Sequence, residues 1–454
     1  MRLEFTSDLP VDAEQAFAWH TRPGAFARLV PPWQRVRLLG DHPGIADGSI
    51  ARLELRLGPI RQHWVARHRD VVAGRQFVDE QISGPFASWH HAHRFEPLDD
   101  RRCRLVDDIS CTLPAGPLGG LAAGTIRRSV SRAFRYRHAV TAADLAFHAG
   151  FREHPRITVA MTGASGLVGR MVAAMLTTAG HRVIPLVRGH PGPGERRWTP
   201  GATLDPATFL GVDAVVHLAG ESIASGRWSA ARKAAIRTSR IAGTTTLVDA
   251  ILKANPRPAV FVGASATGYY GDRGDHPVTE AEPPGRGFLG DLAAEWEGAA
   301  RPLAAGGVRT VTTRFGIVLS PAGGALRAML PPFQLGAGGR LGSGNQWMSW
   351  VSIDDCAAAV VWALLGDLHG PVNVTAPEPV TNRQFTETLG RVLRRPTLMA
   401  VPAAVLRLAL GELADEALLT GARVLPGVLT ASGYQFRHPG LKGALRHVLG
   451  RAAR

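Results

Sequence analysis

Residues 157–169 read ITVAMTGASGLVG, an apolar run of strand-forming residues that ends in three glycines, Gly163, Gly166 and Gly169. Apolar residues at helical spacing follow directly over residues 167–179. A strand, a glycine-rich turn and a helix N-terminus in this order predict a site for a dinucleotide pyrophosphate. Glycines let the backbone approach the phosphates, and the first N–H groups of the helix point at the anion. The alternative is an ordinary glycine-rich loop, because the spacing G-x-x-G-x-x-G differs from the usual G-x-G-x-x-G.

The composition indicates a soluble, globular chain of two or three domains, because 454 residues are too many for one ordinary core. Hydrophobic residues make up 45% of the chain and charged residues 20%. The three cysteines include no C-x-x-C pair, so we expect neither a disulfide framework nor a zinc knuckle, and a reducing compartment is favoured. No secretory signal is visible, and no apolar run approaches the ~20 residues of a membrane span. We therefore expect a cytoplasmic protein without a membrane span.

The net charge of +15 raises the question of a nucleic-acid partner. Only three of the 52 basic residues are lysines, namely Lys233, Lys253 and Lys442. An excess of arginine beside abundant alanine, glycine and proline is typical of a GC-rich genome. The arginines are also dispersed along the chain rather than gathered in one motif. We therefore expect no nucleic-acid partner.

Strand-like and helical segments alternate over residues 155–370, and helical patterns dominate residues 371–454. This alternation predicts a parallel, doubly wound α/β sheet of the Rossmann type, followed by a small, mostly helical C-terminal part. Ligands of such a sheet bind at the carboxyl ends of its strands. The candidate site residues therefore fall where predicted strands end.

The end of the second predicted strand, Leu186-Val187-Arg188, favours NADP over NAD. An NAD enzyme has an acid at this point to accept a hydrogen bond from the ribose 2′-OH, whereas a guanidinium suits a 2′-phosphate. The next strand runs into Leu218, Ala219 and Gly220, whose small side chains leave room for the cofactor backbone. The alternative for Arg188 is an ordinary surface arginine.

Candidate catalytic residues follow the strand near residue 263, namely Ser265, Tyr269 and Tyr270. A serine at a strand end can hydrogen-bond a substrate carbonyl or alcohol. A nearby tyrosine can act as an acid or base if its pKa is lowered. Packing or pocket lining is the alternative role for all three residues.

Residues 1–150 show the pattern of a half-exposed antiparallel sheet, with apolar and polar residues alternating over 53–56 and 105–113. A helical pattern over 118–147 then carries an apolar stripe that includes Val130 and Phe134. A curved sheet closed over one long C-terminal helix is an α+β helix-grip architecture. His91 and His93 share a strand face, but no acidic or cysteine ligand lies nearby in the sequence, so we predict no metal site.

Residues 1–150 resemble the START-like superfamily of polyketide cyclases and lipid-transport proteins. The resemblance rests on FAWHTRPGAF at 17–26, PPW at 31–33, GPFASW at 84–89 and HRF at 93–95. It implies a cavity between sheet and helix that holds an apolar ligand.

Residues 156–449 resemble the extended short-chain dehydrogenase/reductase superfamily, and within it an atypical, epimerase-like branch labelled cell-division-inhibitor-like. The motifs are TGASGLVG at 162–169, LAGESI at 218–223, SATGYYG at 265–271, RFGIVL at 314–319, WVSIDD at 350–355 and GYQF at 433–436. The resemblance implies that NADP is bound by Gly163, Ser165, Gly166, Leu167, Val168, Gly169, Arg188, Leu218, Ala219, Gly220, Arg240 and Val318. For Arg240, the alternative is a salt-bridged helix arginine.

One departure from this superfamily limits the functional prediction. Its catalytic Tyr-x-x-x-Lys pattern is absent, and the aligned place reads Phe288-Leu289-Gly290-Asp291-Leu292. We therefore expect an NADP-binding, oxidoreductase- or epimerase-like protein acting on a small molecule that is either apolar or of an unidentified class. The alternative is a non-catalytic NADP-binding regulatory module whose first domain senses a lipid-like ligand.

Overall fold

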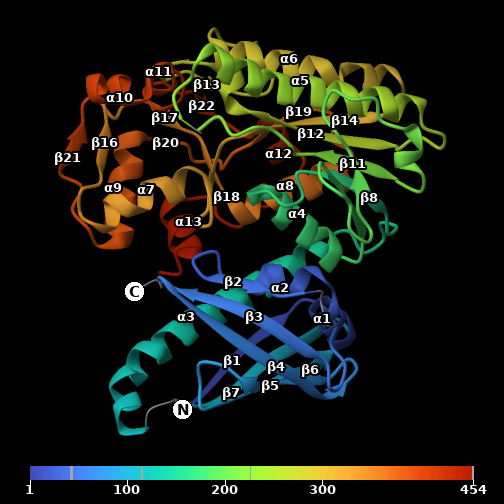
Figure 1. The fold of residues 1–454 in the computed structure, drawn as a ribbon, viewed down its shortest axis with the longest axis vertical. Coiled ribbons are helices and arrows are strands. Elements are labelled where there is room, and N and C mark those ends of the chain that lie inside the picture. The colour runs from blue at the N-terminus through green and yellow to red at the C-terminus, as the bar shows by residue number, and fades with distance from the viewer. Residues whose placement is uncertain (41–43, 114–115, 225, 452–454) are drawn as a thin grey trace. The chain divides into compact units, whose positions relative to one another are not determined.

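The computed structural model describes residues 1–454 except 41–43, 114–115, 225 and 452–454 (Figure 1). The chain divides into two compact units. The first comprises Met1–Pro155, Ala174–Gly180 and Leu449–Arg454, and the second comprises Arg156–Ala173 and His181–Val448. Within the described part of the chain, no helix is both long and apolar enough to cross a bilayer.

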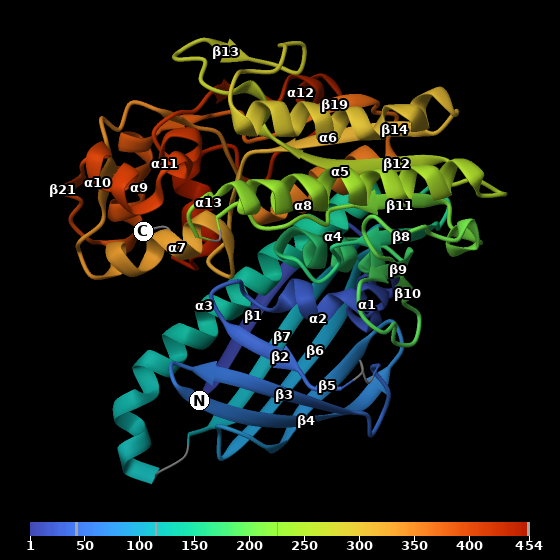
Figure 2. The ribbon, with the colours of Figure 1, turned by 45° about the horizontal axis from the view of Figure 1, so that its top comes forward.

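A seven-stranded antiparallel sheet in the order β1-β7-β6-β5-β4-β3-β2 forms the first unit. Its strands are β1 (Arg2–Leu9), β2 (Arg35–Leu38), β3 (Ile50–Leu57), β4 (Ile60–Val72), β5 (Gln76–Ser83), β6 (Ser88–Asp99) and β7 (Arg102–Thr112). The helices of this unit are α1 (Ala13–Thr21), α2 (Gly24–Leu29) and α3 (Gly116–Ala149). Figure 2 shows the curled sheet and the long helix α3.

The core of the first unit lies between the sheet and its helices, with residues of α1, α2 and α3 packed against the strands. Period-two alternation explains which residues reach it: in β6 the buried residues are Trp89, His91, His93 and Phe95, and the residues between them are more exposed. Phe134 of α3 stacks on Phe5 of β1, with ring centroids 5.2 Å apart. The predicted helix-grip architecture is therefore confirmed.

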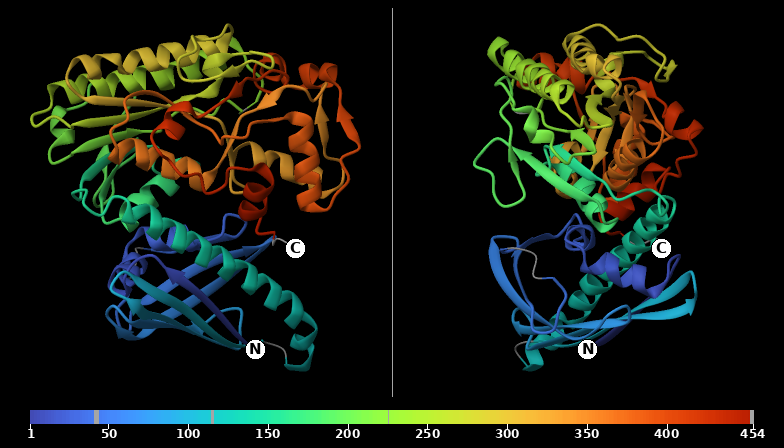
Figure 3. Two further views of the ribbon diagram at one scale, coloured as in Figure 1. Left: turned by 180° about the vertical axis from the view of Figure 1, so that it is seen from behind. Right: turned by 90° about the vertical axis from the view of Figure 1, so that its right-hand side faces the viewer.

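A seven-stranded sheet also forms the second unit, in the order β10-β9-β8-β11-β12-β14-β19, and its neighbouring strands pair in parallel. The strands are β8 (Thr158–Thr162), β9 (Arg182–Val187), β10 (Arg196–Arg197), β11 (Ala214–His217), β12 (Val260–Ala266), β14 (Arg309–Phe315) and β19 (Gly370–Val374). Its long helices are α4 (Leu167–Thr178), α5 (Ala230–Lys253), α6 (Phe288–Ala305) and α8 (Ile353–Leu365). Figure 3 shows helices on both faces of this sheet.

This order confirms the predicted Rossmann-type sheet. The strand order reverses between β8 and β11, which is the switch point where such sheets bind dinucleotides. Four of the five residues of β8 are buried, as expected for a strand covered on both faces.

Short elements complete the second unit. Its further helices are η1 (Pro206–Phe209), η2 (Thr267–Tyr270), α7 (Gly324–Gln334), α9 (Asn382–Leu393), α10 (Ala403–Leu410), α11 (Glu412–Ala417), α12 (Gly427–Ala431) and α13 (Leu441–Val448). The strand pairs are β13 (Pro277–Val278) with β22 (Arg423–Val424), β15 (Ile317–Leu319) with β18 (Trp350–Ser352), β16 (Gly339–Leu341) with β21 (Met399–Val401), and β17 (Trp347–Met348) with β20 (Val380–Thr381). The side chains of Thr381 and Gln384 form a reciprocal capping box at the start of α9.

Candidate functional site

The glycine turn between β8 and α4 is packed so closely that two of its positions exclude a side chain. Gly163 has a φ of +69°, and a Cβ atom there would lie 2.8 Å from the carbonyl carbon of Leu218. A Cβ atom at Gly169 would overlap the carbonyl oxygen of Gly163. Ser165 and Gly166 are exposed at the N-terminus of α4. The turn therefore presents backbone N–H groups to an anion without a side chain in the way.

A buried hydrogen-bond pair joins the ends of β8 and β11. The hydroxyl oxygen of Thr162 lies 2.6 Å from Nδ1 of His217 and accepts the N–H of Ala219 at 3.3 Å. The hydroxyl oxygen has two lone pairs, so it accepts from Ala219 while it is bonded to either tautomer of His217. Burial lowers the pKa of His217 to about 4, so its ring is neutral at pH 7 and can accept this bond. The pair fixes Leu218, Ala219 and Gly220 beside the glycine turn.

Arg240 of α5 lies against Gly220. A Cβ atom at Gly220 would lie 3.4 Å from the guanidinium carbon of Arg240. The same carbon is 5.0 Å from the ring centroid of Trp296, and the guanidinium donates to the carbonyl oxygen of Ile236 at 3.2 Å. Burial lowers the pKa of Arg240 to about 10, so the group still carries its charge at pH 7.

The remaining predicted cofactor residues lie on both sides of the turn. Leu167 contacts the start of α7, where a Cβ atom at Gly323 would lie 3.3 Å from its side chain, and Gly324 in turn approaches the carbonyl oxygen of Val318. Val168 is half-buried in the first turn of α4. Arg188 follows β9 directly and is exposed, and among the described residues it has no hydrogen-bond or ion-pair partner.

Ser265 and Tyr270 belong to a buried polar network that the sequence did not predict. Ser265 at the end of β12 is 2% exposed, and its hydroxyl donates to Oε1 of Glu297 at 2.8 Å. Glu297 also accepts two hydrogen bonds of 2.8 Å from Arg314 of β14. Arg314 donates to the hydroxyl of Tyr270, which donates to Oδ1 of Asn373. Because a buried arginine needs charged or hydrogen-bonding partners, Arg314 in its strand was the sequence signal that could have indicated this network.

The network is accompanied by a raised pKa of Tyr270, whereas a catalytic acid or base at this position needs a lowered pKa. Burial raises the pKa of Tyr270 to about 12 and outweighs the neighbouring Arg314 charge. The side chain is fully buried and its hydroxyl already has two partners. These features favour the alternative role of Tyr270, namely packing, over that of a catalytic acid or base. Tyr269 is half-buried, and its ring lies 3.5 Å from the guanidinium carbon of Arg314.

The place of the missing tyrosine and lysine is apolar and packed. Phe288 lies edge-on to the indole of Trp228, with centroids 5.1 Å apart, and Leu292 is 3% exposed. The Glu416 carboxylate of α11 accepts the N–H groups of Phe288 and Leu289 at 3.2 Å each, so an acid caps the start of α6. Neither Phe288 nor Leu292 can move a proton.

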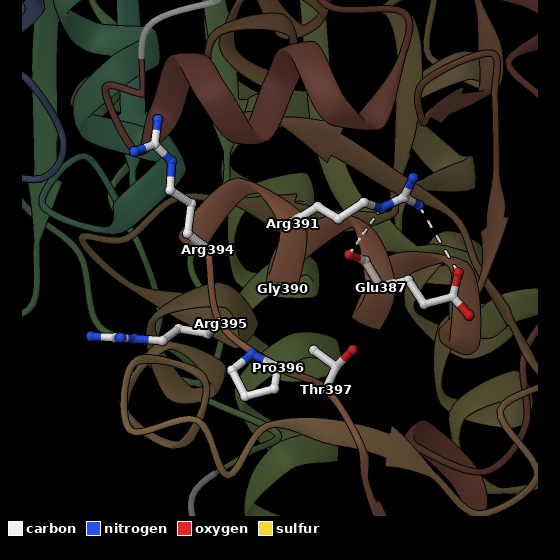
Figure 4. A pocket seen from close by; sticks show the side chains of 7 residues that line it. All are labelled: Glu387, Gly390, Arg391, Arg394, Arg395, Pro396 and Thr397. Atoms are coloured by element: carbon white, nitrogen blue, oxygen red, sulfur yellow. Dashed lines mark hydrogen bonds and ion pairs between the residues drawn. The ribbon is translucent and has the colours of Figure 1, made fainter.

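A separate pocket lies at the C-terminal end of α9 (Figure 4). None of the predicted cofactor or catalytic residues lines it. Its lining residues are Glu387, Gly390, Arg391, Arg394, Arg395, Pro396 and Thr397.

The sheet of the first unit supplies the acids that the linear sequence does not place near His91 and His93. Asp79 of β5 lies opposite His91, and Asp107 of β7 lies opposite His93. Acidic residues that are distant from the two histidines in the sequence are thus brought beside them by the pairing of the strands.

Comparison with known proteins assigns both units to families. The model of the NAD dependent epimerase/dehydratase family matches residues 159–374, and a domain of unknown function (DUF1731) matches residues 401–448. The model described as polyketide cyclase / dehydrase and lipid transport matches residues 9–138.

Relatives that cover about two thirds of this chain agree with the epimerase match. An epimerase family protein of Mycobacterium bovis is 46% identical over 290 residues, which are 63% of this chain and 96% of the relative. The human epimerase family protein SDR39U1, solved with NADPH, is 34% identical with a TM-score of 0.61, covering 65% of this chain and 100% of that one.

The structure of a nucleoside-diphosphate sugar epimerase from Corynebacterium glutamicum is 32% identical with a TM-score of 0.82. The alignment covers 99% of this chain and 90% of the Corynebacterium glutamicum chain. With its NAD(P)-binding turn and its helix-grip first unit, the chain belongs to the NAD dependent epimerase/dehydratase family, as a protein of the SDR39U1 type that carries an N-terminal polyketide cyclase-like domain.

Proposed function

We propose that the second unit binds NADP(H) and uses it in a redox reaction on an unidentified small molecule. The observation that carries this proposal is Arg188, exposed directly after β9, which is the strand beside β8. In this fold the adenosine ribose lies at that strand end, where NAD enzymes have an acid. A guanidinium keeps its charge at physiological pH and bonds two oxygens of a 2′-phosphate. The NADPH in the human relative supports the same choice.

The nearest acid in the sequence does not compete for the ribose. Glu195 accepts the N–H of Gly192 at 2.9 Å and so closes its own loop. The site at the end of β9 therefore favours an anionic ligand group.

Calorimetric titration of the purified chain with NADPH and with NADH tests the cofactor assignment. We expect tighter binding of NADPH, and we expect Arg188→Asp to weaken it by about 10- to 100-fold, because charged hydrogen bonds contribute about 1.5–3 kcal/mol. Arg182→Asp is the matched control, since Arg182 is exposed at the opposite end of the same strand. Equal affinities of the unmodified protein for the two cofactors would contradict the proposal.

For the redox step we assign the proton transfer to Tyr269. Reduction of a carbonyl takes a hydride from the nicotinamide onto carbon and a proton onto oxygen. Ser265 and Tyr270 are buried and their hydroxyls are held by Glu297, Arg314 and Asn373, whereas Tyr269 is half-buried beside them.

Turnover of NADPH with a panel of carbonyl compounds tests this assignment. We expect Tyr269→Phe to lower the rate by about 10²- to 10⁴-fold, the usual contribution of general acid catalysis, and to leave NADPH affinity unchanged. A Tyr269→Phe variant that oxidises NADPH at the unmodified rate removes Tyr269 from the mechanism.

The second candidate function is a non-catalytic NADP(H)-binding module. The apolar packing of Phe288 and Leu292 and the raised pKa of Tyr270 favour it. It predicts NADPH binding without turnover of any carbonyl in the panel. Oxidation of NADPH with even one such substrate excludes this candidate.

A further inference from the structure

Four polar side chains meet on one face of the first unit's sheet. Asp79 comes from β5, His91 and His93 from β6, and Asp107 from β7, which are adjacent strands. Residues two apart on a strand point to the same face, so both imidazoles project together. Cross-strand pairing places a carboxylate beside each of them. The histidine pair is thus flanked by one acid on either side.

The distances on the Asp79 side suit a bound metal ion. Oδ2 of Asp79 lies 3.3 Å from Nε2 of His93 and 3.8 Å from Nδ1 of His91. One ligand atom from each of these residues lies within 4.8 Å of the other two. Two ligand atoms that are each ~2.0–2.2 Å from a tetrahedral Zn²⁺ lie about 3.3 Å apart. An ion therefore fits among the three side chains with small adjustments.

The opposite ring nitrogens of both histidines face Asp107. Nε2 of His91 is 3.3 Å and Nδ1 of His93 is 2.8 Å from Oδ1 of Asp107. Metal-bound histidines almost always present their other ring nitrogen to such an acceptor. Oδ2 of Asp107 is in turn hydrogen-bonded to His138 at 3.0 Å. On the other side, Nδ1 of His68 bonds Oδ1 of Asp79 at 2.6 Å.

Asp107 is the shared acceptor for both rings on the side away from Asp79. Nε2 of His91, Nδ1 of His93 and Oδ1 of Asp107 are buried and make no hydrogen bond among the described residues, although they lie within ion-pair distance of one another. Buried polar atoms without such bonds are rare because they are costly. A metal ion on the Asp79 side would hold both rings with these nitrogens directed at Asp107.

We propose that the first unit binds one divalent transition-metal ion of the zinc class through Asp79, His91 and His93. Imidazole and carboxylate donors suit such ions. Three protein ligands leave one coordination position for water or a bound small molecule. The Asp79 side chain is 26% exposed, whereas His91 and His93 are 2% and 8% exposed, so the open position faces the solvent side of Asp79. Phe77 stacks on the ring of His93, with ring centroids 4.1 Å apart.

Zinc titration of the metal-free full chain by calorimetry tests the proposal. We expect one tight equivalent of Zn²⁺, and a tetrahedral Co²⁺ absorption spectrum after substitution. His93→Gln and Asp79→Asn should each abolish that equivalent, and Asp107→Asn should weaken it by about 10- to 100-fold. His90→Gln is the matched control, because His90 lies on β6 with its exposed side chain facing away.

A second group in the other unit has to be separated from this one. Asp354, His438 and His447 also bring ligand atoms within 4.8 Å of one another. We expect His438→Gln to leave the tight equivalent unchanged. A tight equivalent that disappears in His438→Gln and persists in His93→Gln overturns the proposal, as does a wild-type chain that binds no Zn²⁺.

Thermal denaturation keeps the test decisive if a buried histidine variant does not fold. Zn²⁺ should raise the Tm of the unmodified chain, because an ion that binds only the folded state stabilises it. Asp79→Asn, the mildest change, should remove that increase while the chain stays folded by circular dichroism. An equal increase in both proteins would show that the cluster is an ion-paired group only.

Discussion

At the scale of single residues, the central finding is that Arg314 organises the predicted catalytic residues. Its guanidinium is paired with Glu297, bonded to Tyr270 and stacked on Tyr269. The side chains of Arg314 and Glu297 are 3% and 13% exposed. A desolvated charge of this kind depends on its partner, since an unpaired buried charge is costly. The polar side chains at the end of β12 therefore position one another.

Removal of the Glu297 carboxylate tests this dependence. We expect Glu297→Gln to lower the free energy of unfolding by about 3–5 kcal/mol, because it leaves Arg314 buried without its counter-charge. Glu295→Gln is the matched control on the same helix. Its exposed ion pair with Arg237 should contribute about 0–1 kcal/mol. Urea denaturation of both variants gives the two changes in the free energy of unfolding. Equal losses would show that the buried Arg314–Glu297 pair stabilises the fold no more than the exposed Arg237–Glu295 pair.

At the scale of secondary-structure elements, the cofactor site depends on the alignment of β8 with β11. Thr162 and His217 are register partners across these two strands, and both are fully buried. The Thr162 hydroxyl links this pair to the loop that passes the glycine turn. A change in the charge of His217 therefore acts on the framework of the site.

Acid should destabilise this pair of strands. Burial holds the pKa of His217 at about 4 in the folded state, below the usual 6.5, so the unfolded chain takes up a proton first. Stability that is present above pH 6.5 is lost as the pH falls toward 4, by roughly 3 kcal/mol for this group. Urea midpoints across this range should fall less steeply in His217→Gln than in the unmodified chain. If the urea midpoints of the two proteins fall in parallel with pH, a group other than His217 causes the loss of stability in acid.

At the scale of the whole molecule, local patterns in the sequence predict both architectures. Period-two alternation over residues 105–113 indicates the antiparallel sheet, and the strand–glycine–helix order at 157–169 indicates the Rossmann sheet. These signals are readable because each arises within a few neighbouring residues.

Contacts between distant segments could not be predicted in the same way. Asp79 and Asp107 meet the histidines of β6 through strand register, and Glu297 meets Arg314 through the packing of α6 on the sheet. A single sequence does not specify either pairing. The hydrogen bond of Tyr270 to Asn373 could not be predicted for the same reason, because Tyr270 lies in η2 and Asn373 in the distant strand β19.

The contact between Arg240 and Trp296 gives the protein an optical reporter of its own. The indole lies 5.0 Å from a guanidinium that itself abuts Gly220, where the pyrophosphate passes in the proposed complex. Indole emission overlaps the absorption of reduced nicotinamide, so excitation of Trp296 would transfer to a bound NADPH and its fluorescence would fall. The difference between the unmodified chain and Trp296→Phe would isolate this one indole among ten tryptophans and allow occupancy to be followed in real time without any attached dye.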